Sequence, residues 1–558
     1  MIVFEAVTIA YAGASALRDA SFAIPEGELV LVVGPTGSGK TSLLRCLGGP
    51  ATSGDTPSTR GVDHAHGKVT RTGRVLVDGA DLWGAGTDEE RAVVGLVRQD
   101  PAADLVDGTV ESVIAAGVRP RADDPHRGQR QVEETLDLLG LAGLRSRPVA
   151  ELSGGQVQRV AIGVALAGGP RVLVLDEPTS ALDPVAAEEV LAILHRLVHD
   201  VGVTVVVAEH RLERVVHHAD SVLLVEAGRV IGPLDPATAM TRSPIRPPVV
   251  DLGLRLGWSP VPLSVRAGRR QAKGLRAALD HDRSGDVPGD RRDDRRDDRR
   301  DDRRDDRRDD RRDDRRDDGP GTRGEVRVDV HRLSLLRGQV VALRTVTLQV
   351  HGGEVVVLMG RNGAGKSSLL GALHGSLGPT SGRVRVSGPS ALAPQDPAVL
   401  LTDAAVGSQL TANDAAHALI PGSSATLLER LVPGLPSARH PTELSEGQKM
   451  CVALSLVLAR GSQVVLLDEP TRGLDYQAKA RLTTLLSQLA AAGRTVILAT
   501  HDVELAADVA TRAIILADGE VVADGPARRI LSDSPAFAPQ VAKVMHPLPL
   551  LRVSDVVS

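Results

Sequence analysis

Gly34-Pro-Thr-Gly-Ser-Gly-Lys40-Thr41 has a counterpart, Gly360-Arg-Asn-Gly-Ala-Gly-Lys366-Ser367, in the second half of this 558-residue chain. Each stretch directly follows an apolar run, Leu29–Val33 or Val355–Met359, of the kind that forms a buried strand. The glycines let successive backbone N–H groups curl round a phosphate at a helix N-terminus. A flexible glycine turn could explain one such loop. Two in matching contexts predict two phosphate-binding loops (P-loops).

The motifs that follow each P-loop recur at matched spacings. Ser153 precedes Asp176 by 23 residues, and Ser445 precedes Asp468 by the same number. The next motif histidine lies 34 residues beyond the first aspartate and 33 beyond the second. A repeat of this length is far longer than the units of solenoid proteins, so each copy is a whole domain with its own core. The sequence therefore predicts a duplicated nucleotide-hydrolysing domain.

Composition places the chain among soluble globular proteins, with 42% hydrophobic and 25% charged residues. The net charge of −5 gives no basic footprint for nucleic acid, so no nucleic-acid partner is expected. Cys46 and Cys451 are too few for a disulfide framework and are predicted to be core residues. No apolar run approaches the roughly 18 residues needed to span a bilayer, so any membrane role is expected to come from partners.

Between the halves, Asp290 is followed by seven Arg-Arg-Asp-Asp tetrads that end at Asp318. A four-residue period puts like charges at every i,i+4 position of a helix and offers nothing apolar to bury, which predicts a disordered linker. We expect five regions: a first domain, its trailing segment, the linker, a second domain and a C-terminal tail. Their predicted bounds are 1–242, 243–284, 285–323, 324–545 and 546–558.

Leu152-Ser-Gly-Gly-Gln156 and Leu444-Ser-Glu-Gly-Gln448 each open an apolar helix, and an apolar strand ending in Asp-Glu-Pro follows 23 residues after each serine. With the P-loops, these motifs resemble the ATP-binding cassette (ABC) family over nearly the whole chain outside the linker. The resemblance implies an α/β fold with two tandem P-loop NTPase domains. Each would have a mixed or parallel sheet core and a helical subdomain.

In this family two cassettes close head to tail, so the P-loop of one faces the Leu-Ser-Gly-Gly-Gln signature of the other and two ATP molecules lie between them. If this chain follows the family's arrangement, its first site would bind ATP with the P-loop of the first half and the signature of the second half. Its residues would be Gly34, Pro35, Thr36, Gly37, Ser38, Gly39, Lys40, Thr41, Ser445, Gly447 and Gln448. The residues of the second site would be Gly360, Arg361, Asn362, Gly363, Ala364, Gly365, Lys366, Ser367, Ser153, Gly154, Gly155 and Gln156.

The resemblance also assigns chemical roles. Mg²⁺ would be held with ATP by hydroxyls and aspartates, namely Thr41, Asp176, Ser367 and Asp468. The attacking water would be polarised by Glu177 and Glu469. Histidines would bridge each of these carboxylates to the γ-phosphate, namely His210 and His501. Glutamines of two Gln-Asp-Pro turns would sense the γ-phosphate, namely Gln99 and Gln395. An aspartate seven residues after the first residue of each Asp-Glu-Pro motif, Asp183 or Asp475, would couple the two sites.

The halves differ at informative positions. Tyr11, 23 residues before Gly34, matches the aromatic that stacks on adenine in this family, whereas the equivalent residue of the second half is Arg337. Glu446 replaces the first glycine of the signature, and we expect it to tune the site rather than inactivate it. The second half is also shorter where the first carries Asp78–Val94, which we read as a peripheral hairpin and helix.

Within the family the chain resembles the energy-coupling factor (ECF) transporter ATPases, importers of vitamins and metal ions, in a form that fuses both cassettes. Gln-Asp-Pro in both halves, Ala208–Glu213 and Ile245–Pro248 carry this resemblance. It implies an integral-membrane scaffold (T-type) subunit docking near the Gln-Asp-Pro turns, a substrate-binding membrane subunit, and a place at the cytoplasmic face of the membrane. A fused sugar-importer ATPase and a tandem-cassette ribosome-associated translation factor remain as alternatives. The neutral linker distinguishes the chain from that factor, which carries a basic helical linker.

Overall fold

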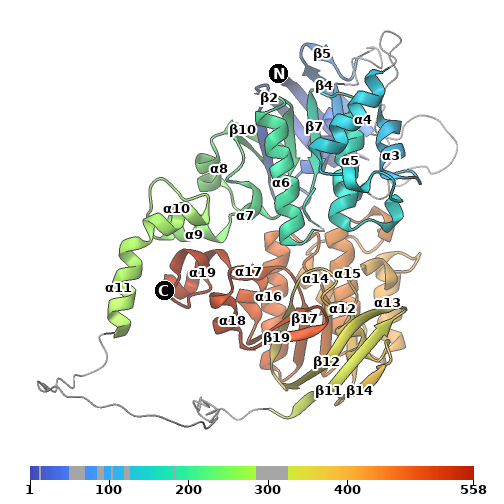
Figure 1. Ribbon diagram of the computed structural model, residues 1–558, viewed down its shortest axis with the longest axis vertical. Helices are drawn as coiled ribbons and strands as arrows, with labels where there is room; N and C mark the ends of the chain where they lie inside the picture. Colours follow the sequence, from blue (N-terminus) through green and yellow to red (C-terminus); the bar gives the residue numbers. More distant parts are fainter. Residues whose placement is uncertain are drawn as a thin grey trace, which may run out of the picture.

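The chain folds into two halves of the same design, shown one above the other in Figure 1. The computed structural model describes residues 1–11, 14–48, 69–84, 93–101, 105–118, 126–180, 182–284 and 324–557. The linker predicted at 285–323 lies outside these residues. No helix within the described ranges is long and apolar enough to cross a bilayer.

The main sheet of the first half has six strands in the order β10-β9-β3-β8-β7-β6. Its strands are β3 (Leu29–Val33), β6 (Val94–Val97), β7 (Val172–Asp176), β8 (Thr204–Ala208), β9 (Ser221–Glu226) and β10 (Arg229–Leu234). All neighbours pair in parallel except β10, which pairs antiparallel with β9. Strands β3, β7 and β8 are buried at every position, which explains their continuous apolar sequences. The carboxyl ends of these central strands carry the motif residues.

A second, antiparallel sheet and a group of helices complete this half. The sheet follows the order β2-β1-β4-β5, with β1 (Ile2–Tyr11), β2 (Ala14–Ile24), β4 (Val69–Val77) and β5 (Ala80–Asp81). The helices are α1 (Lys40–Leu47), α3 (Val110–Gly117), α4 (Arg127–Leu138), α5 (Gly154–Ala167), α6 (Pro184–His199), α7 (Leu212–Val215) and α8 (Pro236–Arg242). Helices α3, α4 and α5 pack on one another as a helical subdomain.

The second half repeats this plan. Its main sheet has the order β15-β16-β17-β13-β18-β19, formed by β13 (Val355–Met359), β15 (Ser390–Ala393), β16 (Val464–Asp468), β17 (Thr495–Ala499), β18 (Arg512–Ala517) and β19 (Glu520–Pro526). Its antiparallel sheet has the order β12-β11-β14, formed by β11 (Val326–Arg337), β12 (Val340–His351) and β14 (Ser381–Val386). It lacks a strand equivalent to β5, as the shorter sequence predicts; the expected extra helix of the first half falls outside the described residues.

The helices of the second half end in two short segments near the C-terminus. They are α12 (Lys366–His374), α13 (Val406–Ala416), α14 (Ser423–Leu431), α15 (Glu446–Ala459), α16 (Tyr476–Ala491), α17 (Val503–Val509), α18 (Ala527–Asp533), α19 (Gln540–Met545) and α20 (Val553–Val556). In Figure 1 the helical subdomains of both halves, α3–α5 and α13–α15, lie along the same side of the molecule.

Each main sheet separates two apolar cores. Leu29, Leu31 and Val33 face one cluster, while Val30 and Val32 face the other, because successive side chains of a strand point to opposite faces. The second half shows the same alternation along β13.

The segment predicted to trail the first domain packs against the end of the second. It forms α9 (Pro248–Arg255), α10 (Val265–Gln271) and α11 (Lys273–Ser284), and α9 and α10 contact α19. Gln540 accepts a hydrogen bond from the backbone N–H of Val249 at 3.1 Å. Val541, Val544 and Met545 join the first half's core. The two halves are thus joined at their C-terminal ends by a shared apolar interface (Figure 1).

Candidate functional site

Both P-loops adopt the tight turn that their glycines predict. Gly39 and Gly365 sit immediately before α1 and α12 with φ of 111° and 100°. A Cβ atom would lie 2.4 Å from a backbone carbonyl oxygen at Gly39 and 2.5 Å from one at Gly365. Only glycine therefore fits at either position. The backbone can therefore bring N–H groups to the helix N-terminus, where an anion is stabilised.

The P-loop lysines are held inside the turn. Lys40 Nζ donates to the carbonyl oxygens of Gly34 at 2.7 Å and Pro35 at 3.0 Å. Lys366 repeats the arrangement with Gly360 at 2.8 Å and Arg361 at 3.0 Å. Burial lowers the pKa of both ammonium groups, although nearby carboxylates oppose the shift. The buried Oγ of Ser38, in the same loop, has no hydrogen-bond partner among the described residues. The loop thus leaves polar groups available to a phosphate.

The pairs Thr41–Asp176 and Ser367–Asp468 fit a magnesium ion. In each pair the hydroxyl at the start of the helix faces the aspartate at the end of the neighbouring strand closely enough to oppose the rise of that aspartate's pKa. Burial raises the pKa of both aspartates, which a bound cation would reverse. No group of three or more His, Cys, Asp or Glu side chains in the described ranges is arranged to hold a metal alone. Proteins usually bind Mg²⁺ with a few of their own oxygen atoms together with phosphate oxygens of the nucleotide.

Next to these aspartates, a glutamate and a histidine are in contact in each half. Glu177 Oε1 lies 2.8 Å from His210 Nε2, and Glu469 Oε2 lies 2.7 Å from His501 Nδ1. Both glutamates have φ near +50°, a conformation uncommon for residues other than glycine and often found at functional sites. Each keeps its backbone N–H bonded to the following strand at 2.9 Å.

The two glutamine turns are placed differently. Gln99 Nε2 donates to Glu177 Oε2 at 2.9 Å, so it reaches the predicted catalytic carboxylate of its own half. Gln395 is exposed, and no hydrogen bond joins it to Glu469 in the described structure. The sequence predicted equivalent roles for both.

The signature serines cap their helices. Ser153 and Gln156 form a reciprocal capping box at the start of α5, and Ser445 and Gln448 form the same box at the start of α15. Glu446, the departure from the signature, pairs with Lys449 at 2.8 Å. This ion pair offsets the extra carboxylate.

The acids predicted to couple the sites lie at the boundary between halves. Asp475 Oδ1 caps α16, while Oδ2 accepts a hydrogen bond from the backbone N–H of Thr36 in the first P-loop at 2.9 Å. Asp183 caps α6, and its charge acts on Lys366 of the second half. Elements of one half therefore contribute to the P-loop surroundings of the other.

Some residues near the sites carry no role in the sequence prediction. Tyr476 Oη donates to Glu213 Oε2 at 2.7 Å and so bonds the halves together. Buried Glu209 accepts from the backbone N–H of Thr179 at 2.7 Å, whereas the matching residue of the second half is Thr500. The residue after each motif histidine is Arg211 in one half and Asp502 in the other. Aligning the two halves reveals these contrasts, but not the contacts that result.

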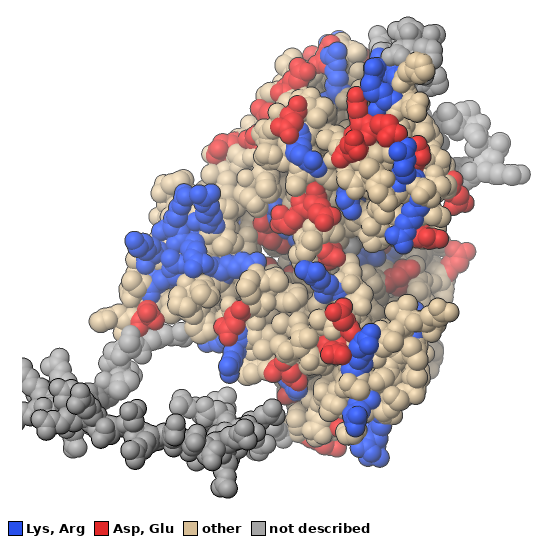
Figure 2. Space-filling view, viewed as in Figure 1, with Lys and Arg blue, Asp and Glu red and all other residues tan. Residues whose placement is uncertain are grey.

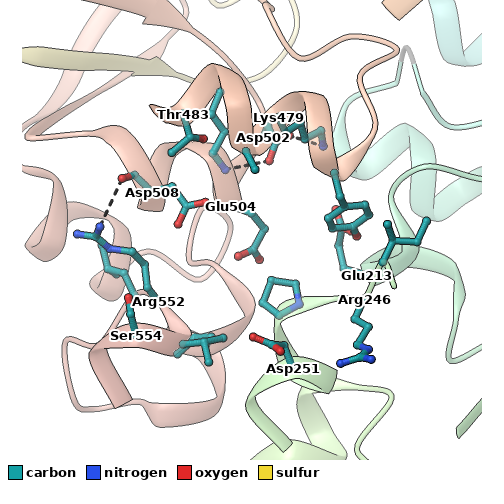
Figure 3. Close-up of a pocket in the computed structure, with 18 of the residues that line it drawn as sticks. Glu213, Arg246, Asp251, Lys479, Thr483, Asp502, Glu504, Asp508, Arg552 and Ser554 are labelled. Atoms are coloured by element: carbon teal, nitrogen blue, oxygen red, sulfur yellow. Dashed lines mark hydrogen bonds and ion pairs between the residues drawn. The ribbon is translucent and has the colours of Figure 1, made fainter. Parts of the chain in front are cut away.

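A cavity of about 460 Å³ opens at the boundary between the halves. Its lining comes from α7 and α9 on one side and from α16, α17 and α20 on the other. Figure 3 shows Glu213, Asp502 and Glu504 around it, with Lys479 reaching Asp502.

The profile of the ABC transporter family matches residues 17–180 and 343–472. A protein of Streptomyces avermitilis, provisionally named an ABC transporter ATP-binding protein, is 50% identical over 100% of this chain and 99% of its own length. A protein of Methanosarcina acetivorans with the same provisional name is 30% identical over 98% of this chain and 88% of its own.

Solved structures share the two-half arrangement. The RNase-L Inhibitor covers 94% of this chain with 91% of its own, at a TM-score of 0.57 and 19% identity. A model of ribosome-bound archaeal Pelota and ABCE1 includes a chain that covers 96% of this one with 80% of its own, at a TM-score of 0.61 and 20% identity. At these identities the likeness concerns the fold alone.

Proposed function

The chain belongs to the ABC transporter family as a two-cassette ATPase, and from that premise we propose that it is the energy-coupling subunit of a bacterial importer of the ECF type. Two ATP molecules would lie between the halves, each held by one P-loop and the signature of the other half. The proposal that both halves share each ATP site rests on the hydrogen bond from the backbone N–H of Thr36 to Asp475. This bond joins the first P-loop to the coupling acid of the second half.

The chain's own residues would divide the work in each site. The P-loop amides and lysine would bind phosphates, and the Thr41–Asp176 or Ser367–Asp468 pair would hold Mg²⁺. The ion would neutralise charge on the phosphates. Glu177 and Glu469, each oriented by a histidine, would take up the proton of the attacking water. Motion of the halves would pass to membrane partners.

Exposed apolar side chains support docking of a membrane partner beside the glutamine turns. Val106 is 61% exposed and follows the Gln99 turn, while Val399 is 73% exposed and follows the Gln395 turn. Val106 lies seven residues after Gln99, and Val399 lies four residues after Gln395, so each half carries an exposed apolar side chain within two turns of chain from its Gln-Asp-Pro motif. The scaffold subunit of an importer would cover them, and the solute would bind a separate membrane subunit.

Co-purification from membranes tests this proposal. The unchanged chain is expected to carry integral-membrane proteins with it, whereas Val106→Asp with Val399→Asp is expected to lose them and to keep its ATPase activity within about twofold, since surface charges away from the sites perturb folding little. Val522→Asp is the matched control, because Val522 is 59% exposed on β19 of the second half. Membrane proteins that remain bound to the double variant would contradict the docking site.

A basic surface favours the translation-factor alternative and needs its own test. Six Arg and Lys residues and no acidic residue lie between Asp251 and Asp280. Arg266, Arg269 and Lys273 are exposed there, and Figure 2 shows the basic side chains gathered over α9 and α10. Recovery of the chain with ribosomes in a salt-sensitive manner, and without membrane proteins, would favour this alternative over the importer.

A further inference from the structure

The residue before each motif histidine differs between the halves: it is Glu209 in the first and Thr500 in the second. Both side chains are buried, with 2% and 0% of their surface exposed. Burying a carboxyl group is unfavourable unless its oxygens are hydrogen-bonded. One oxygen of Glu209, Oε2, has no hydrogen-bond partner among the described residues. Such a group in a protein core calls for an explanation, and the bond made by its other oxygen supplies one.

The other oxygen, Oε1, accepts a hydrogen bond from the backbone N–H of Thr179 at 2.7 Å. Thr179 lies two residues after Glu177, and Pro178 between them has no N–H to donate. The N–H of Glu177 itself donates to the carbonyl oxygen of Ala208 at 2.9 Å. Two neighbouring residues, Ala208 and Glu209, therefore accept both N–H groups of the segment 177–179.

The same stretch of chain also reaches the Glu177 side chain. His210 directly follows Glu209, and its Nε2 lies 2.8 Å from Glu177 Oε1. Glu177 has a φ of 52°, and a residue other than glycine keeps this unfavourable conformation only where its surroundings fix it. The bond from Thr179 to Glu209 is one of the contacts that fix it, because it holds the chain just beyond the strained residue.

The second half holds its glutamate differently. The Thr500 hydroxyl lies 3.5 Å from Glu469 Oε2 and accepts a hydrogen bond from the N–H of Asp502 at 3.0 Å. Within the described structure no hydrogen bond joins Thr500 to Thr471, the counterpart of Thr179. The N–H of Glu469 keeps its bond to Ala499 at 2.9 Å. The segment after Glu469 is thus fastened to the neighbouring strand end at one N–H group, where the first half uses two.

We propose that Glu209 is a positioning residue of the first site: it fixes the backbone that follows Glu177 and so orients the Glu177 carboxylate toward the attacking water. The inference rests on the ATP hydrolysis of the proposed function and is independent of any membrane partner. It means that the two sites orient their glutamates by different contacts, with a buried carboxyl group in one half and a hydroxyl in the other.

Single-turnover ATP hydrolysis by the full chain carrying Glu469→Gln, which leaves the first site active, tests this. Glu209→Val removes the acceptor and has the shape of threonine, which the second half accommodates at the same place. It is expected to slow hydrolysis about tenfold, a part of the ~10²–10⁴-fold that a general base contributes. The half-saturating ATP concentration is expected to change less than about twofold, because the P-loop is unaltered. Glu209→Gln keeps an acceptor oxygen and is expected to restore most of the rate.

Two controls separate a change of position from a loss of stability. In the chain carrying Glu177→Gln, where the second site stays active, Glu209→Val is expected to change the rate less than about twofold. Glu28→Val removes a partly buried carboxylate that bonds Ser221 at the opposite end of β3 from the P-loop, and is expected to leave the first site's rate within about twofold.

An unchanged rate with Glu209→Val, an equal loss in the two single-site chains, or failure of Glu209→Gln to restore the rate would overturn the proposal. A weaker ATP affinity without slower hydrolysis would overturn it as well. Absence of ATP hydrolysis from the unsubstituted chain would instead contradict the proposed function.

Discussion

Tyr11 and Arg337 occupy matching places at the tip of a hairpin. Tyr11 ends β1 and pairs with Ala14, and Arg337 ends β11 and pairs with Val340. Tyr11 packs against the core of its half, whereas Arg337 is exposed. The sequence predicted that these residues flank the adenine of each site, and the strand ends put them in equivalent positions.

Tyr11→Ala is expected to weaken ATP binding at the first site by the ~0.5–1.5 kcal/mol of an aromatic stack, and Arg337→Ala to cost the second site less. An exposed guanidinium keeps much of its hydration, so the second site is expected to discriminate less against GTP. Competition between ATP and GTP in chains with Lys40→Ala or Lys366→Ala isolates each site. Equal preference for ATP in both chains would mean that another residue supports adenine in the second half.

The short motifs could be predicted because each one depends only on the backbone conformation of neighbouring residues. The P-loop glycines, the aspartates at strand ends and the signature caps each depend on residues within a few positions, so spacing alone places them. The bond between Tyr476 and Glu213 joins residues 263 positions apart, and no periodicity encodes it. The asymmetry of Gln99 and Gln395 was missed for the same reason: identical turns meet different surroundings.

At the scale of elements, α9 and α10 belong to a shared interface rather than to one half. Their contacts with α19, and those of α9 with α20, give the predicted trailing segment and tail a structural role that their sequences do not reveal. Next to this interface Glu504 of α17 accepts a hydrogen bond from the backbone N–H of Gln540 at 2.8 Å. Burial, with Glu213 and Asp502 nearby, raises its pKa from 4.5 to about 8.

This raised pKa predicts that stability falls as pH rises. Below pH 4.5 Glu504 is protonated in both folded and unfolded chains; between 4.5 and about 8 the folded chain holds the proton more tightly, so the stabilisation is lost as pH rises through that range. Glu504→Gln keeps an acceptor for Gln540 without the charge. Its melting temperature is expected to fall less between pH 6 and 9 than that of the unchanged chain. Glu520→Gln, at an exposed place on β19, is the control. Identical pH dependence in all three would refute the assignment.

At the scale of the whole molecule, the halves face each other so that each site draws on both. Asp475 reaches the first P-loop, Asp183 acts on Lys366, and Tyr476 ties α16 to α7. Duplication made two such domains predictable, but only the structure relates their surfaces. The central claim is that each ATP is held by the P-loop of one half and the signature of the other.

Counting ATP retained through gel filtration by a hydrolysis-deficient chain, Glu177→Gln with Glu469→Gln, tests this claim most directly. If the first P-loop works with Ser445, then adding Lys40→Ala and Ser445→Arg together disables one site twice and should leave about one ATP per chain. Adding Lys366→Ala and Ser445→Arg disables both sites and should leave almost none. The reverse outcome, with ATP retained only by the Lys366→Ala and Ser445→Arg chain, would show that each P-loop works with the signature of its own half and would contradict the account.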